Sequence, residues 1–112
     1  MKNTRPLLVL VLALAFTGVQ AQKLKTAEEY NNRGLEKQNR GDLDGAIEDY
    51  TAAISLKGKP GTLAIAYNNR ANARMTKNDL ENAIADYGKA IELEPRNEEN
   101  YYNRGVCLLA KG

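Results

Sequence analysis

One unit occurs nearly three times in this chain and limits what it can fold into. The complete copy runs from Ala64 to Pro95, a diverged copy precedes it over 27–56, and a half copy follows over 98–112. Tyr67 and Tyr101 occupy matching places in the complete copy and the half copy, and so mark the length of one repeat. A repeat of this length is typical of solenoids, in which each unit is a pair of helices stacked on the next pair.

Apolar residues recur at helical spacing, and no strand-like alternation occurs. In the second half of the complete copy they are Leu80, Ala83, Ile84, Tyr87, Ala90 and Ile91. We expect amphipathic helices over 27–39, 43–56, 63–76, 80–93 and 98–111, capped by Thr26, Asp42, Thr62, Asp79 and Asn97. Gly41 is expected to end the first helix, and Lys57–Gly61, with two glycines and a proline, to form a loop. Short connections make consecutive helices antiparallel, so the sequence predicts an all-α solenoid of five helices.

The segment 1–21 is interpreted as a secretory signal peptide. Lys2 and Arg5 precede an unbroken apolar run over 7–16, and Val19-Gln20-Ala21 has a small-x-small cleavage pattern. The apolar run is shorter than the roughly 20 residues of a spanning helix, although a retained N-terminal anchor is the alternative. We therefore expect an exported protein, periplasmic or secreted, with no membrane span after cleavage. Its parts would be a signal peptide (1–21), a polar lead (22–26) and one repeat domain (27–60, 64–97 and the half copy 98–112).

Removal of the signal peptide changes the charge of the chain. The sequence has 16 basic and 14 acidic residues, and Lys2 and Arg5 are the charged residues before Ala21, so 14 of each sign would remain. No basic stripe survives, so we expect no nucleic-acid partner.

The residue types also argue against catalysis. The chain has no histidine, which excludes the commonest general base and the usual zinc ligand. It has neither a glycine-rich phosphate loop nor a calcium-loop spacing, and we interpret its carboxylates as solvated surface. Cys107 is the single cysteine and is expected to be a buried small filler, with an intermolecular disulfide as the alternative. We therefore expect no catalytic residue, no cofactor and no metal.

The residues that recur at matching places resemble the tetratricopeptide repeat family. The complete copy supplies Tyr67, Ala71, Ala83, Tyr87, Ala90 and Pro95, the first copy Tyr30, Gly34, Ala46, Tyr50 and Ala53, and the half copy Tyr101, Gly105 and Leu108. The resemblance implies a right-handed α-solenoid in which small residues let paired helices approach closely. The chain departs from the family at Arg33, Arg70 and Arg104, where an apolar residue is more usual.

The resemblance also implies a concave groove lined by the first helix of each repeat. Its residues here would be Asn31, Asn32, Leu35, Asn68, Asn69, Asn72, Tyr102 and Asn103. The same groove position is Asn in all three copies: Asn32, Asn69 and Asn103. This asparagine ladder could bind the N–H and C=O of a peptide backbone. The alternative is that Asn is simply a common residue of the repeat. The family's clamp for C-terminal carboxylates is excluded, because Glu99 stands where that clamp needs a lysine.

We therefore expect a non-catalytic adaptor or scaffold that binds a short extended peptide or a partner helix in its groove. The alternative is a self-associating structural protein of the envelope. Two and a half repeats leave the last helix uncovered, and Val106, Leu108 and Leu109 could then stack on another copy. A truncated remnant of a longer repeat protein is a third, weaker interpretation.

Overall fold

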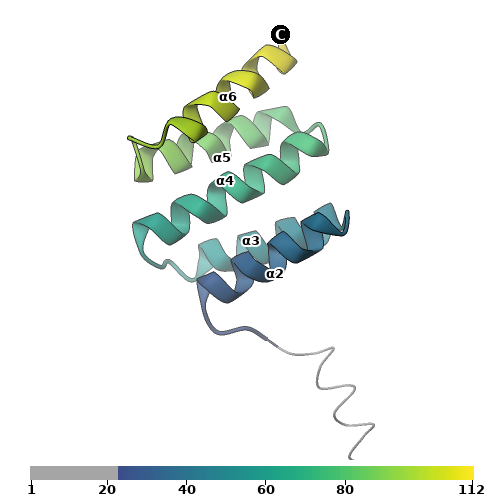
Figure 1. Ribbon diagram of the computed structural model, residues 1–112, viewed down its shortest axis with the longest axis vertical. Helices are drawn as coiled ribbons and strands as arrows, with labels where there is room; N and C mark the ends of the chain where they lie inside the picture. The colour runs from purple at the N-terminus through teal and green to yellow at the C-terminus, as the bar shows by residue number, and fades with distance from the viewer. Residues whose placement is uncertain (1–22) are drawn as a thin grey trace, which may run out of the picture.

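The computed structural model describes residues 23–112, so the predicted signal peptide lies outside the described residues. Five helices follow one another: α2 (Ala27–Asn39), α3 (Leu43–Ser55), α4 (Pro60–Thr76), α5 (Leu80–Leu93) and α6 (Glu98–Lys111). They stack in chain order, from α2 and α3 at the bottom of Figure 1 to α6 at its top. No strand occurs in residues 23–112, and the expected all-α solenoid is confirmed.

Most of the predicted helix ends are confirmed by their caps. The Glu29 backbone N–H donates to Thr26 Oγ1 at 3.1 Å, and the Gly45 N–H donates to Asp42 Oδ1 at 2.9 Å. Gly41 has a φ of +85°, a conformation that glycine adopts without steric cost after a helix.

The start of α4 was predicted wrongly. This helix begins at Pro60, so Lys57–Gly61 is not wholly a loop and Thr62 is not its cap. Proline is favoured at the first position of a helix, because its fixed φ suits the helix and its missing N–H would have no partner there. Thr62 instead donates to Glu28 Oε1 at 3.2 Å and links α4 to α2. Asp79 also accepts no backbone N–H; its carboxylate accepts from Asn82 Nδ2.

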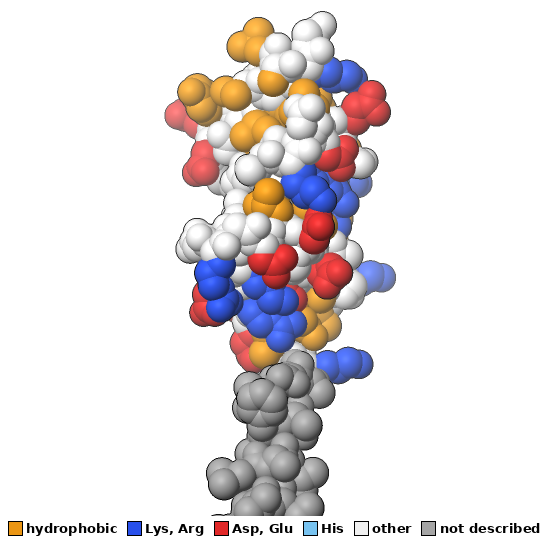
Figure 2. All heavy atoms as spheres, turned by 90° about the vertical axis from the view of Figure 1, so that its right-hand side faces the viewer, with side chains coloured by type: hydrophobic (Ala, Val, Ile, Leu, Met, Phe, Trp, Pro, Cys, Tyr) orange, Lys and Arg blue, Asp and Glu red, His pale blue; other side chains and the backbone are white. Residues whose placement is uncertain are grey.

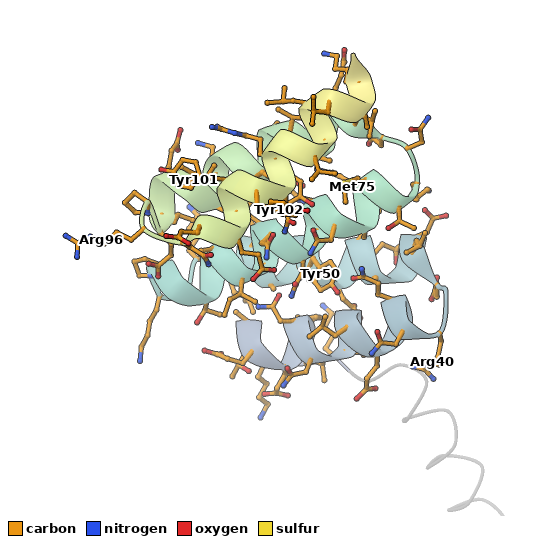
Figure 3. All side chains as sticks on the ribbon, turned by 45° about the horizontal axis from the view of Figure 1, so that its top comes forward. Arg40, Tyr50, Met75, Arg96, Tyr101 and Tyr102 are labelled. Atoms are coloured by element: carbon orange, nitrogen blue, oxygen red, sulfur yellow. The ribbon has the colours of Figure 1, made fainter. Side chains whose placement is uncertain are left out.

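The core is built from small residues and two tyrosines. Tyr50 and Tyr87 are fully buried, and the alanines at matching places in each repeat pack beside them. A Cβ atom built on Gly34 would lie 2.5 Å from Tyr50 Cε1, so the absence of a side chain there lets α2 and α3 approach closely. Figure 3 shows Tyr50 inside the stack, and Tyr101 and Tyr102 on α6.

The stack is curved. The backbones of α2 and α4 approach within 8 Å (Cα to Cα), as do those of α4 and α6, whereas those of α3 and α5 do not. The first helices of the repeats are therefore the more closely spaced layer, which is the layer expected on the concave side. Within residues 23–112, no helix combines the length and the apolar character needed to cross a bilayer.

Candidate functional site

The three asparagines of the predicted ladder have free hydrogen-bonding groups. Asn32 is exposed and Asn69 and Asn103 are partly exposed. None of the three side chains hydrogen-bonds to another group within residues 23–112. Each carboxamide can therefore offer a donor and an acceptor to a bound segment.

Two other predicted groove residues are engaged within the protein. Asn31 is only 5% exposed, and its Nδ2 donates to the Thr62 carbonyl at 3.5 Å. Asn72 Oδ1 accepts the hydroxyl hydrogen bond of Tyr87. By contrast, Leu35 and Tyr102 are exposed, Tyr102 by 72%. The apolar surface of the groove is therefore more accessible than part of its predicted polar surface.

An open cleft of about 470 Å³ lies between the start of α4 and the turn that leads into α6. Of the eight predicted groove residues, Asn68 alone lines it, together with residues that the sequence did not single out: Lys59, Thr62, Ile65, Glu94 and Asn100 among others. Lys59 and Glu94 place opposite charges at the cleft, so it does not favour a ligand of either sign.

Two carboxamides at this cleft have unpaired buried atoms. Asn68 Oδ1 and both Oδ1 and Nδ2 of Asn100 are buried without a hydrogen-bond partner in the described part of the chain. Asn100 is only 1% exposed. An unpaired buried polar group costs about 1–3 kcal/mol, so a polar group in the cleft would gain by pairing with one of them once that side chain turned toward it.

The polar contacts at this cleft differ from those at the matching place one repeat earlier. At the matching place between α2 and α4, the Asn31 and Glu28 side chains bind Thr62. Asn68 Nδ2 has no equivalent bond in the described part of the chain, although Oδ1 is buried without a partner in both asparagines. Asn100 also holds the place that Ala66 holds one repeat earlier, and Ala66 packs in a small apolar cluster. The change from alanine to asparagine at this place was therefore a signal in the sequence that was missed.

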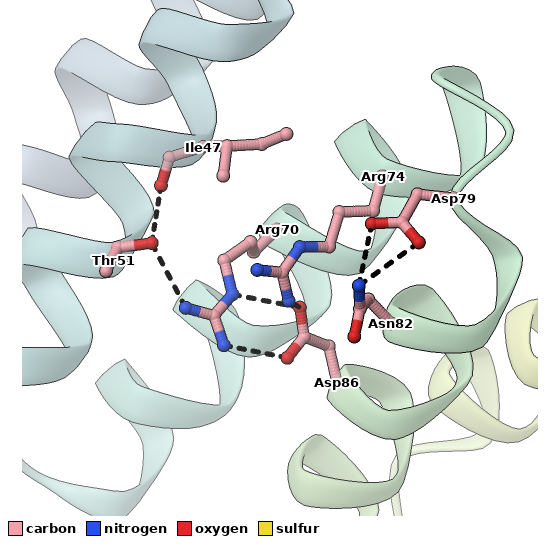
Figure 4. A network of polar contacts seen from close by, with 7 residues as sticks. All are labelled: Ile47, Thr51, Arg70, Arg74, Asp79, Asn82 and Asp86. Carbon is pink, nitrogen blue, oxygen red and sulfur yellow. Dashed lines mark hydrogen bonds and ion pairs between the residues drawn. The ribbon is translucent and has the colours of Figure 1, made fainter.

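The recurring arginines form an ion-pair network that was not predicted from the sequence. Arg33 binds both carboxylate oxygens of Asp49, each at 2.9 Å, and Arg70 binds both oxygens of Asp86 at 2.9 and 2.8 Å. In both pairs the acid follows the arginine by 16 residues. Arg74 also binds Asp86, at 2.7 Å (Figure 4). Each bidentate pair joins the two helices of one repeat.

This pairing affects the titration of the buried acid. Burial alone would raise the pKa of Asp49, but hydrogen bonds from Arg33 and Lys37 outweigh burial and hold the pKa below its usual value. The bond to Asp49 in turn raises the pKa of Arg33. The network therefore keeps charged groups between the two helices of each of the first two repeats.

Cys107 is a packing residue, as predicted. It is fully buried against Ala71, Ala83 and Tyr87, and burial raises the pKa of its thiol. It is a free thiol. Within residues 23–112, no group of three or more His, Cys, Asp or Glu residues could hold a metal ion.

Comparison with known proteins gives a family. A model described as "Tetratricopeptide repeat" matches residues 27–60, and one described as "TPR repeat" matches residues 71–112. The two matches together cover more than half of the chain. No curated protein matches the sequence.

Proposed function

Because the chain belongs to the tetratricopeptide repeat family, whose repeats generally mediate protein–protein interaction, we propose that it is a non-catalytic adaptor. In this proposal, the groove of α2, α4 and α6 holds a short extended segment of a partner protein. The cleft with the unpaired carboxamides of Asn68 and Asn100 carries the proposal, because a peptide unit has one donor and one acceptor to offer them.

The size of the groove limits the ligand. Three helices spaced about 10 Å apart span roughly 20 Å, which is the length of about six extended residues. The cleft contains both Lys59 and Glu94, so charge adds little to the affinity. We expect dissociation constants on the order of micromolar.

The test is selection from a library of random displayed peptides against the full chain. Selected peptides should bind Asn68→Ala and Asn69→Ala about tenfold more weakly than the parent chain, because each variant removes a carboxamide. Glu48→Ala, at an exposed position on α3, is the matched control and should bind as the parent does. If no peptide is enriched, or if both asparagine variants bind like the parent, the groove proposal is wrong.

Self-association is the second candidate, and the exposure of α6 favours it. Leu109 is 85% exposed and Leu108 48%. In this alternative, these residues and Val106 stack on another copy. Sedimentation over a wide concentration range tests it, since a monomer at every concentration would exclude it.

We also propose that the chain is exported, on the strength of the apolar run over 7–16 and the cleavage pattern that ends at Ala21. N-terminal sequencing of the protein recovered from its native cell should then begin at Gln22. Recovery of an intact N-terminus in the cytoplasmic fraction would contradict export.

A further inference from the structure

Helix α6 has a face that no described residue covers. Cys107 packs against α5 on one side of α6, while Tyr101, Leu108 and Leu109 are 44%, 48% and 85% exposed. Figure 2 shows hydrophobic side chains gathered at the upper end of the molecule, where α6 lies. We call Tyr101, Arg104, Gly105, Leu108 and Leu109 the open face of α6.

Helices α2 and α4 have a face equivalent to the open face of α6, and the contacts of that face show what α6 lacks. Arg104 holds the place of Arg70 one repeat later, and each of these arginines lies over the ring of a tyrosine one helical turn earlier, at 5.8 and 5.5 Å. Arg33 lies over Tyr30 in the same way, at 5.5 Å. In α2 and α4, the arginine so placed binds a carboxylate on the following helix. In the described part of the chain, no carboxylate forms an ion pair with Arg104.

The space beside the glycine of the open face is also empty of described side chains. At Gly34, an added Cβ would meet the ring of Tyr50 at 2.5 Å, because that ring packs directly on the glycine. At Gly105, which holds the same place in its repeat, an added Cβ would meet nothing within 4 Å. The open face therefore has room for an aromatic ring where α2 already holds one.

The residues around this space on α6 determine whether a tyrosine or a phenylalanine ring would fit it. The hydroxyl of Tyr50 donates to Gln38 Oε1 at 2.6 Å, and that of Tyr87 donates to Asn72 Oδ1. The residues of α6 at these two places are Leu109 and Val106, which accept no hydrogen bond. A buried tyrosine hydroxyl would be left unpaired there, whereas a phenylalanine ring would not.

We propose that the open face of α6 binds an amphipathic helix of another protein that carries Asp-Phe-x-x-Ala. The aspartate pairs with Arg104, the phenylalanine lies on Gly105, and the alanine takes the place of the fully buried Ala53 and Ala90. The order follows Asp49-Tyr50 with Ala53 and Asp86-Tyr87 with Ala90, with the ring changed to suit α6.

A second copy of this chain fits the open face less well. Its two Asp-Tyr helices, α3 and α5, are buried in their own repeats, and both carry the hydroxyl that α6 cannot pair. The sequence has a single phenylalanine, Phe16, and the residue before it is Ala15. The proposal concerns a different face from the peptide groove and does not rest on the function proposed for the groove.

The probe is a fluorescent synthetic peptide that copies residues 79–95 with Tyr87→Phe. The full chain is titrated into this peptide, and binding is followed by fluorescence anisotropy. We expect saturable binding, and about fivefold weaker binding when the peptide keeps its tyrosine. Asp86→Lys in the peptide, or Arg104→Glu in the chain, should weaken binding about tenfold or more, and the two changes together should restore most of it.

Two further variants test whether the probe binds at the open face, independently of folding and of the groove. Gly105→Leu fills the space for the ring and should abolish binding without unfolding a helix in which that side chain is exposed. Asn68→Ala alters the groove and should bind the probe as the parent chain does.

Three results would overturn the proposal. The first is that the phenylalanine peptide shows no saturable binding. The second is that its Asp86→Lys form binds equally well. The third is a dimer of the chain that Arg104→Glu dissociates, since the face would then belong to a second copy.

Discussion

Gly34 and Gly105 hold the same place in their repeats but have opposite surroundings, so replacing each with alanine tests the packing directly. At Gly34 the added Cβ would lie 2.5 Å from Tyr50 Cε1 and 2.8 Å from Cδ1. The ring cannot move away easily, because it is fully buried and its hydroxyl is bonded to Gln38. At Gly105 the Cβ would enter open space.

The magnitudes follow from two effects. Alanine inside a helix is favoured over glycine by about 1 kcal/mol, and this gain applies at both sites. Overpacking of a buried ring costs about 1–3 kcal/mol and applies at Gly34 alone. We therefore expect Gly105→Ala to stabilise the chain by about 1 kcal/mol, and Gly34→Ala to be less stable than Gly105→Ala by about 1–3 kcal/mol.

The assay is urea unfolding followed by far-UV circular dichroism. The free energies of unfolding of the two variants are compared with the same dependence on urea concentration for both. Gly88→Ala on α5 is a second control, because its Cβ would also meet nothing within 4 Å. If Gly34→Ala were as stable as Gly105→Ala, the close approach of α2 and α3 and the register that matches the two glycines would both be refuted.

Three further predictions concern the buried polar groups. Asp86→Ala leaves Arg70 without its acid and should lower the free energy of unfolding by about 2–4 kcal/mol in urea; a loss below about 0.5 kcal/mol would show that the pair is not structural. The pKa of Asp49 is lowered, so its contribution to stability is complete above the unfolded value of 3.8 and is lost as the pH falls through the folded pKa. Thermal melts from pH 5 to pH 2 should show this loss, and Asp49→Asn should reduce it. Burial raises the pKa of Tyr50 and Tyr87 to about 12, against 10.0 when unfolded, so the unfolded chain releases these protons first and stability should fall between pH 10 and pH 12. A melting temperature that stays constant over that range would contradict the burial of both hydroxyls.

The helices could be predicted from the sequence because their signals are local. The helical spacing of apolar residues and the caps at Thr26 and Asp42 lie within one or two turns of the elements that they define. The start of α4 was missed because Pro60 was interpreted as part of a loop. A proline at the first position of a helix lacks an N–H that would have had no partner, so it begins the helix instead.

The cleft and the ion pairs could not be located in the same way, because they depend on contacts between helices. Asn100 and Asn68 line one cleft although they belong to different repeats. The Arg–Asp pairs do have a signal in the sequence, since both arginine and aspartate recur with a constant separation of 16 residues. The asparagine ladder of the groove stays a prediction, which the peptide selection tests.

The ion pairs of Arg33 and Arg70 indicate how selective the open face of α6 would be. An apolar strip such as Leu108 and Leu109 would accept almost any amphipathic helix, because burial of apolar surface is not directional. Arg104 changes this, since a docked helix without an acid opposite it would bury an unpaired guanidinium, which costs more than the apolar contacts nearby can easily offset. A buried ion pair adds little net stability but strongly penalises the wrong partner. Arg104 is thus expected to act mainly by rejecting helices without an acid, so uncharged variants at this position should broaden the range of helices bound, whereas the charge reversal Arg104→Glu weakens binding of the probe.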